Sequence, residues 1–541
     1  MKLTDKTNVF VVVGPPGCGK TYSIAKNIEK NIGEYGETGI MVCSLTKTAA
    51  REASGRVGLP HEQVGTLHSF AYRAIGGGAV AESKIDEWNE AFPSLSVSGG
   101  TVSDDVDDNA MDQRGGNNTD GDELMSKLTL LRARCVRQDS WPVDVRMFFK
   151  KWSDWKQSCG YIDFSDMIEI ATTDTVTAPG NPYLIYMDEA QDCSLAESRL
   201  LSHWGGAAHK VVVVGDPMQS LYEWRGADPD EFFPADIPAE RKHILAQSYR
   251  VPEAVRAEAV RWANRMRGRV PEEYHARKYF DGETAFGSVR YSDASLTRNL
   301  DDIVRMVDDA KGTVMILASC AYQLKPIITE LRAAGIPFHN PYRMRNGAWN
   351  PMGGKRGGVS ARARILAFNQ INVAGAWTML DIQKWADVLA TDGVLKRGAK
   401  AEIKAADTNR AYTWIELSSM LENWFEPESF EPTLNADVKW WYDHLTKAKK
   451  PGAAFPVEIF LRRGADALAE QPKVIVGTIH SVKGGEADTV ILSPDLSKSG
   501  YLEWDAESAG IRRLFYVGMT RAIENLILLS PASRMAVDWG E

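Results

Sequence analysis

A glycine-rich turn near the start of the sequence contains residue types that bind phosphate. It follows the apolar run NVFVVV at residues 8–13, and a segment with apolar residues at Ile24, Ile28 and Ile32 comes after it. That order predicts a buried strand, a tight turn and a helix. The turn consists of Gly14, Pro15, Pro16, Gly17, Cys18, Gly19, Lys20 and Thr21. We therefore predict a nucleoside triphosphate site in preference to a chance glycine-rich turn.

Each part of this turn has a chemical task in such a site. Glycines allow backbone N–H groups at the start of the helix to close around the phosphates. Lys20 is expected to reach the β- and γ-phosphates, and Thr21 to offer its hydroxyl to magnesium.

Two carboxylates, Asp188 and Glu189, follow a predicted buried strand at residues 183–187. Ligands of open parallel sheets bind beyond the carboxyl ends of the strands, so both side chains are expected to face the nucleotide. Asp188 is predicted to hold magnesium, and Glu189 to orient and deprotonate the attacking water. Alternatively, the pair caps the N-terminus of the next helix. The glycine-rich turn upstream favours the catalytic interpretation.

Gln219 follows another predicted strand, KVVVVG at residues 210–215, and is the polar group expected nearest the γ-phosphate. Tyr222 and Trp224 come next, with Arg225 directly behind them. Such aromatic residues either pack in the core or stack on the bases of a single strand, which contributes about 1 to 3 kcal/mol per base.

Strands and helices alternate around these residues, which predicts an α/β fold with parallel sheets. Strands are expected at residues 39–44 and at the start of 64–75, and a second series at 313–319, 473–477, 488–493 and 525–530. Helical insertions are expected at 79–160, with an acidic disordered loop at about 96–122, and at 346–469. The tryptophans of the second insertion are expected in its core: Trp377, Trp385, Trp414, Trp424, Trp440 and Trp441.

Composition indicates a globular protein of several domains: 541 residues, 44% hydrophobic and 25% charged. The six cysteines form no CxxC pair, which argues against a zinc site or a disulfide framework and favours a reducing compartment. Without a signal-peptide pattern or a long apolar run, we expect a cytoplasmic or nucleoid-associated protein, neither secreted nor membrane-inserted. The net charge of −9 decides little about nucleic acid, because groove binding needs only a local basic surface.

In content and order, the motifs resemble those of a superfamily 1 DNA helicase of the UvrD and Rep type. They are GPPGCGKT, TKTAA, GTLHSF, DEAQD, GDPMQSLYEWRGA, QSYR, TIHSVKGGEADTVIL and YVGMTRA, between Gly14 and Ala522. The resemblance implies two RecA-like motor lobes with parallel sheets, each with a mainly helical inserted domain. We place the first lobe at 1–78 and 161–245, its insertion at 79–160, the second lobe at 246–345 and 470–541, and its insertion at 346–469.

The resemblance also implies roles for individual residues. Tyr22 joins the nucleotide-binding turn, Tyr249 stacks on the adenine and Glu486 contacts the ribose. Arg250 and Arg521 approach the γ-phosphate from the second lobe, where they stabilise the charge that develops during transfer. The path of single-stranded DNA is lined by Thr46, Thr66, His68, Tyr222, Trp224, Thr478 and His480. His68 and His480 are alternatively structural histidines.

The implied activity is that of an ATP-dependent DNA helicase or translocase that moves 3′ to 5′, with Mg2+ as cofactor and single-stranded and forked DNA as partners. Two rivals stay open: a translocase that strips proteins from DNA without separating strands, and a DNA-binding recruitment factor that uses ATP only as a switch. The sequence departs from the family pattern in three places. Gly510 and Ile511 precede Arg512 and Arg513 where acidic residues are usual. Residues 1–13 contain no glutamine to read the adenine edge, and Leu45 stands where a phenylalanine is usual.

Overall fold

A computed structural model describes residues 3–44, 58–98, 119–266, 273–344, 346–353, 358–410 and 412–540. The chain divides into two compact units. Unit 1 comprises Met1–Ser292, Ala318–Tyr322 and Thr478–Glu541, and unit 2 comprises Asp293–Leu317 and Gln323–Gly477. All of the predicted site residues belong to unit 1.

The first sheet of unit 1 has the strand order β3-β2-β6-β7-β1-β8, with all neighbouring strands parallel. Its strands are β1 Val9–Val13, β2 Ile40–Ser44, β3 Val64–Thr66, β6 Leu184–Met187, β7 Lys210–Gly215 and β8 Lys242–Ile244. Every residue of β2 and β6 is buried, because both faces of a parallel sheet are covered by helices. The helices that accompany this sheet are α1 Lys20–Tyr35, α3 Leu67–Ala74, α8 Phe164–Asp174, α9 Leu195–Gly205 and α10 Pro229–Phe232.

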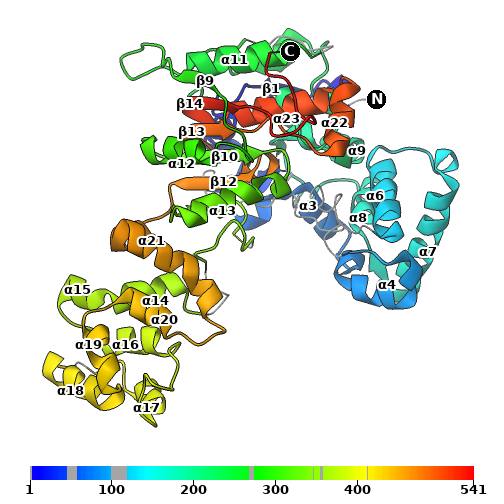
Figure 1. Ribbon diagram of the computed structural model, residues 1–541. Coiled ribbons are helices and arrows are strands. Elements are labelled where there is room, and N and C mark those ends of the chain that lie inside the picture. The colour runs from blue at the N-terminus through cyan, green and yellow to red at the C-terminus, as the bar shows by residue number, and fades with distance from the viewer. Residues whose placement is uncertain are drawn as a thin grey trace. The chain divides into compact units, whose positions relative to one another are not determined.

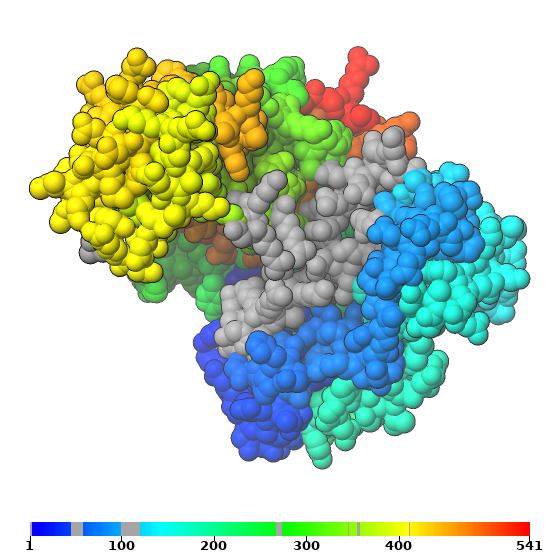
Figure 2. Space-filling model, turned by 90° about the horizontal axis from the view of Figure 1, so that it is seen from below, coloured from blue at the N-terminus to red at the C-terminus, as the bar shows by residue number. Residues whose placement is uncertain are grey.

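A helical insertion leaves the sheet after α3 and returns at α8. It contains β4 Ala79–Val80, α4 Ile85–Ala91, α6 Asp120–Ala133, α7 Val143–Cys159 and β5 Tyr161–Ile162. Its helices gather into one group in Figure 1 and form a continuous packed surface, blue to cyan, in Figure 2. The core of the group is strongly aromatic, with Trp88, Phe148 and Trp152 almost fully buried. Residues 99–118 of the predicted acidic loop lie outside the described residues, whereas Thr119 and Asp122 form a capping box at the start of α6.

A buried cluster of charges ties this insertion to α8. Arg132 of α6 forms ion pairs with Asp163 at 2.9 Å, Asp166 at 2.7 Å and Glu169 at 2.8 Å. Lys156 of α7 pairs with Asp163 and Asp166 as well. Although burial alone would raise it, these cations hold the pKa of Asp163 well below its usual range. The insertion is therefore anchored by ionic contacts as well as by aromatic packing.

The remainder of unit 1 contains a second group of parallel strands, in the order β13-β14-β9. The elements are α11 Glu253–Ala263, β9 Ser288–Ser292, β13 Ala487–Leu492, α22 Lys498–Asp505, α23 Ala509–Met519 and β14 Ala522–Leu529. Helix α11 lies along β9 and β14 (Figure 1). Near the end of the chain, Trp539 donates from its indole N–H to the Leu529 carbonyl at 2.8 Å, which holds the last residues against β14.

Unit 2 is mainly helical, with a short parallel pairing of β11 and β12. Its strands are β10 Val314–Ala318, β11 Phe338–His339 and β12 Val474–Thr478. Its helices are α12 Leu300–Asp309, α13 Lys325–Ala333, α14 Ala361–Phe368, α15 Gln370–Ala374, α16 Met379–Ala386, α17 Ala399–Ala405, α18 Trp414–Trp424, α19 Pro427–Leu434, α20 Val438–Asp443 and α21 Lys450–Ala469. Helices α14 and α20 both pack on α21. Four of the six tryptophans expected in the core are buried, whereas Trp440 is half-buried and Trp414 is 36% exposed.

The predicted α/β class is confirmed, and its parallel sheets and helical insertions agree with two RecA-like lobes. Residues 46–57, whose sequence TKTAAREASGRV suits a helix, lie outside the described residues. Among the helices described, none is both long and apolar enough to cross a membrane.

Replacing Arg132 by Met should destabilise the insertion by about 3 to 5 kcal/mol, because Asp163 would then be buried with too little compensating charge. Urea unfolding followed by tryptophan fluorescence would measure the loss. Lys127→Met is the matched control on the same helix, since Lys127 forms an exposed, solvent-screened pair with Glu123 that contributes little to stability. Equal stability of the two variants would contradict an anchoring role for the cluster.

Candidate nucleotide and DNA site

The glycine-rich turn joins β1 directly to α1, as predicted. Gly17 and Gly19 adopt φ angles of 74° and 75°, which favour glycine. A side chain at Gly17 would place its Cβ 2.4 Å from the Cβ of Arg250, so the close approach of these two segments also requires glycine. The turn therefore presents backbone at the start of a 16-residue helix, the arrangement that receives phosphate.

Lys20 and Thr21 both point back toward the sheet. Lys20 is buried and donates from Nζ to the Gly14 carbonyl at 2.9 Å. Thr21 donates from Oγ1 to Oδ2 of Asp188 at 3.0 Å. Burial would lower the pKa of Lys20, but the neighbouring Cys18 thiol and nearby carboxylates raise it. Lys20 therefore remains charged where a phosphate chain would approach.

Asp188 and Glu189 lie at the carboxyl end of β6, as expected, and differ in their environments. Burial and the adjacent Glu189 raise the pKa of Asp188 to about 6. Burial would also raise the pKa of Glu189, but Lys483 and Lys20 lower it to about 2. Glu189 is therefore ionised at neutral pH, as a general base must be. A cation beside Asp188 would offset the burial and the repulsion from Glu189 that raise its pKa.

The capping alternative for these carboxylates is wrong. Helix α9 begins after Ser194, whose side chain forms a capping box with Glu197. Glu189 precedes only a short 3₁₀ turn and makes no side-chain cap there. It also has a φ angle of 54°, an uncommon conformation for a non-glycine residue that accompanies functional sites.

Two further residues, neither of them predicted from the sequence, hold Glu189. Gln191 donates from Nε2 to Oε2 of Glu189 at 2.6 Å and accepts from the backbone N–H of Asp216 at 3.0 Å. The Lys483 ammonium lies 3.4 Å from the same Oε2 and forms an ion pair with Asp192. Gln191 lies inside DEAQD and Lys483 inside TIHSVKGGE. These positions could have identified both residues, since polar residues within such motifs are candidates for the site.

Gln219 and Arg521, predicted to face the γ-phosphate, contact each other. The Arg521 Nη2 donates to Oε1 of Gln219 at 2.9 Å, and Nε and Nη1 donate to the carbonyls of Val517 and Gly485. Gln219 donates in turn from Nε2 to Asp216 at 2.8 Å. Arg521 is almost completely buried, so its guanidinium is fixed by these contacts beside the carboxylate cluster.

The QSYR segment packs on the glycine-rich turn. The backbone N–H of Tyr249 donates to the Gly17 carbonyl at 2.8 Å, and the Ser248 hydroxyl donates to the Pro16 carbonyl at 2.8 Å. The ring of Tyr249 is 72% exposed, as a base-stacking platform must be, and Tyr22 is exposed as well. Arg250 donates from Nε to Oε2 of Glu486 at 2.5 Å, so two residues with predicted nucleotide contacts lie together.

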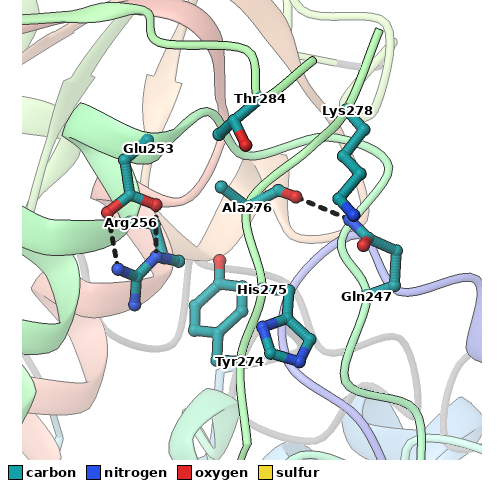
Figure 3. Close-up of a pocket in the computed structure, with 8 residues that line it drawn as sticks. All are labelled: Gln247, Glu253, Arg256, Tyr274, His275, Ala276, Lys278 and Thr284. Atoms are coloured by element: carbon teal, nitrogen blue, oxygen red, sulfur yellow. Dashed lines mark hydrogen bonds and ion pairs between the residues drawn. The ribbon is translucent and has the colours of Figure 1, made fainter. Parts of the chain in front are cut away.

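A polar cavity of about 250 Å³ lies behind this segment (Figure 3). It is lined by Gln247, Glu253, Arg256, Tyr274, His275, Ala276, Lys278 and Thr284, with no residue of the glycine-rich turn. In Figure 3 the ring of Tyr274 lies between Arg256 and His275. The backbone of His275 pairs with Ala246 and Ser248, and Gln247 donates to the Ala276 carbonyl at 2.6 Å. These contacts brace the segment that presents Tyr249 and Arg250.

Two of the predicted DNA-contacting threonines occupy identical turns. Thr66 ends β3 and accepts the backbone N–H of Ser69 at 3.1 Å, while the Ser69 hydroxyl donates to the Thr66 carbonyl at 2.7 Å. Thr478 ends β12 and makes the same pair of contacts with Ser481, at 3.2 and 2.8 Å. The sequence signal for this similarity is the Gly-Thr-x-His-Ser pattern that GTLHSF and GTIHSV share. Thr46 falls outside the described residues.

The aromatic residues predicted to stack on DNA bases are more buried than the side chains of an open stacking surface would be. Tyr222 is 3% exposed, and its ring lies 6.4 Å from that of Trp224 and 6.3 Å from that of His480. Trp224 is half-buried. His68 is buried too, 3.6 Å from Glu197 and edge-on to Phe164, which is the setting of a packed histidine. Tyr222, Trp224 and His480 thus form one cluster, with His68 in a separate place.

The donor set around Asp188 and Thr21 fits magnesium. Mg2+ binds hard oxygen ligands, and beside a nucleotide it uses one or two carboxylates plus phosphates and water. Thr21 Oγ1 and Asp188 Oδ2 supply a neighbouring hydroxyl and carboxylate at the end of the glycine-rich turn. No group of three or more His, Cys, Asp or Glu suited to a metal occurs in the described ranges, so phosphates and water would have to complete the shell.

Residues 2–237 match the family described as the UvrD/REP helicase N-terminal domain, and residues 473–529 match the UvrD-like helicase C-terminal domain. The ATP-dependent DNA helicase PcrA of Bacillus subtilis (strain 168) is 23% identical across 99% of this chain and 82% of its own length. PcrA of Leuconostoc citreum is 23% identical across 69% of this chain and 58% of its own. The ATP-dependent DNA helicase Rep of Escherichia coli (strain K12) is 32% identical, across 17% of this chain and 15% of its own.

The two matched regions contain the motifs whose residues contact one another in the structure. The first region contains the glycine-rich turn and DEAQD, and the second contains TIHSVKGGE and GMTRA. The chain therefore belongs to the UvrD/Rep type of superfamily 1 ATP-dependent DNA helicases.

Proposed function

We propose that the protein is an ATP-driven motor that moves 3′ to 5′ along single-stranded DNA and unwinds duplex DNA. One observation carries the proposal: four motifs that are far apart in the sequence meet in a continuous series of contacts. Glu189 lies 3.4 Å from the Lys483 ammonium, Lys483 donates to the Gln219 carbonyl at 3.3 Å, and the Gln219 side chain accepts from Arg521. This convergence supports hydrolysis as well as nucleotide binding.

In the proposed reaction, the residues of the site divide the work of phosphoryl transfer. The glycine-rich turn and Lys20 would bind the phosphates, and Asp188 with Thr21 would hold Mg2+, which would neutralise charge on the phosphate oxygens. Glu189 orients water and takes its proton. Arg250 and Arg521 stabilise the charge that develops in the transition state. Tyr249 and Glu486 hold the adenine and the ribose.

For DNA, we propose that the two Gly-Thr-x-His-Ser turns grip the strand at successive points. Each turn ends a parallel strand and leads into a helical start. Thr46, His68, Tyr222, Trp224 and His480 complete the proposed path on single-stranded and forked DNA. The lobes of the motor are proposed at 1–78 with 161–245 and at 246–345 with 470–541, with insertions at 79–160 and 346–469.

Two alternatives differ in what hydrolysis accomplishes. A recruitment factor that uses ATP only as a switch needs neither the positioned base Glu189 nor the buried Arg521, so the assembled site speaks against it. A translocase that strips proteins from DNA has the same site, and a duplex-unwinding assay distinguishes it from a helicase.

Lys20→Ala should abolish ATP turnover, because the phosphates lose their principal cation. Glu189→Gln should keep ATP binding and lose most hydrolysis, since an amide of the same shape cannot accept the proton. A fluorescent ATP analogue would measure binding, and phosphate release with single-stranded DNA would measure turnover. Wild-type turnover by Glu189→Gln would show that another group is the base.

Arg250→Ala and Arg521→Ala should each lower the turnover number much more than the affinity for ATP, with losses of roughly 10³ for a γ-phosphate arginine. Arg256→Ala is the control, because Arg256 pairs with Glu253 on α11 and lines the cavity behind the segment. Steady-state kinetics with DNA at saturation separate the two constants. A defect confined to ATP affinity in both variants would overturn the proposed role.

A duplex with a 3′ single-stranded tail should be unwound with ATP and Mg2+, and one with a 5′ tail should stay intact. Trp224→Ala should hydrolyse ATP while unwinding falls, because the loss of about 1 to 3 kcal/mol of stacking weakens the grip on bases. Strand separation on gels measures both effects, with Tyr279→Ala, an exposed aromatic elsewhere, as control. Unwinding of the 5′-tailed duplex would reverse the polarity, and normal unwinding by Trp224→Ala would make that residue structural.

A further inference from the structure

We propose that the polar cavity behind the QSYR segment is a binding site for a phosphate group, separate from the proposed nucleotide site. The cavity measures about 250 Å³, below the roughly 300 to 1,000 Å³ of pockets that enclose drug-sized ligands. It can therefore enclose a phosphate or a small phosphate ester but not a whole nucleotide. None of the residues that line it is part of the glycine-rich turn or has a role in the proposed ATP reaction.

The Tyr274 hydroxyl is a donor inside this cavity that lacks an acceptor. Its oxygen is buried and has no hydrogen-bond partner among the described residues. Burial raises the pKa of this phenol above its usual value, so the hydroxyl keeps its proton. In Figure 3 it points toward Thr284, beside the guanidinium of Arg256, which lies 6.0 Å from the centre of the ring. Since buried polar groups are seldom left unpaired, this hydroxyl indicates an acceptor that binds in the cavity.

The charges of the lining indicate that this acceptor is an anion. Glu253 accepts from Nε and Nη2 of Arg256 at 2.8 and 2.6 Å, so the charge of this carboxylate is compensated. Lys278 forms no ion pair in the part of the chain that the structure describes. The imidazole of His275 lies 2.7 Å from the exposed carboxylate of Glu273. The ammonium of Lys278 is thus a cation of the lining without a counter-charge, which a phosphate would supply and a water molecule would not.

The donors of the lining come from different sides of the cavity. Those without an acceptor in the described ranges are the Tyr274 hydroxyl, the Lys278 ammonium, Nη1 of Arg256 and the Thr284 hydroxyl. Lys278 and Thr284 are held opposite each other by a β-bridge, whereas Arg256 belongs to α11. A phosphate presents its oxygens in a tetrahedron and can accept from several such directions, whereas the two oxygens of a carboxylate lie in one plane. The arrangement therefore favours phosphate.

Isothermal titration calorimetry with inorganic phosphate tests the site in the full chain. Tyr274→Phe, which removes only the hydroxyl oxygen, should weaken phosphate binding about tenfold, because a hydrogen bond to a charged group is lost. Lys278→Gln should weaken it to a similar extent. Tyr279→Phe and Lys30→Gln are the matched controls, at exposed positions outside the cavity, and should bind phosphate as the unmodified chain does. Thermal unfolding checks that each variant folds.

Further titrations identify the place and the ligand. One phosphate should still bind when ADP and Mg2+ are present, and its displacement by ADP would place it at the glycine-rich turn and overturn the proposal. Glycerol phosphate should bind as well, and the tighter of the two ligands shows whether the site takes free phosphate or a phosphate ester. Acetate that binds as tightly as phosphate, or normal phosphate binding by both Tyr274→Phe and Lys278→Gln, would also overturn the assignment.

Discussion

The crowding of carboxylates at the carboxyl ends of β6 and β7 is the constraint on which the rest of the site depends. Asp188 and Asp192 follow one strand and Asp216 follows the other, all three almost fully buried, and the partly exposed Glu189 lies directly after Asp188. Burial raises the pKa of Asp188 and of Asp192 to about 6 and also raises that of Asp216. Buried charges are tolerated only with compensating partners, so the fold must bring cations and donors to this edge.

The partners come from opposite ends of the chain. Lys20 arrives on the turn after β1, near the start, and Lys483 arrives after β12, more than 460 residues later. Gln191 satisfies one carboxylate and fastens it to the strand end that carries Asp216. The compensation of these buried carboxylates thus brings together the motifs that are proposed to carry out ATP turnover. The residues that compensate the buried carboxylates of the proposed nucleotide site are thus also contacts that hold distant segments of unit 1 together.

The two Gly-Thr-x-His-Ser turns give the proposed DNA path two segments with the same local geometry. Each turn satisfies its own backbone through a threonine and a serine, so its geometry is set locally by residues within four positions. Their histidines differ, because His68 packs beside Glu197 whereas His480 lies beside Tyr222. The two turns therefore have the same local hydrogen bonds, whereas tertiary packing gives their histidines different neighbours.

The sequence by itself determined the local elements of this protein. Strands β1, β2, β6 and β7 lie within a residue or two of their predicted positions, because apolar runs bounded by glycine, proline or acidic residues are strong strand signals. The α/β class and the glycine-rich turn followed from the same signals. Strands β8 and β11 have only three and two residues, too few to carry such a pattern, and were not predicted.

Only the tertiary structure decided which polar groups meet. The bond between Gln219 and Arg521 joins residues 302 positions apart, and nothing in the spacing of GDPMQ and GMTRA implies it. The position of Lys483 beside Glu189 and the burial of Tyr222 could not be predicted from the sequence either, since both depend on which segments pack together. A motif specifies backbone shape over a few residues, whereas partners, exposure and pKa values arise from neighbours that are distant in the chain.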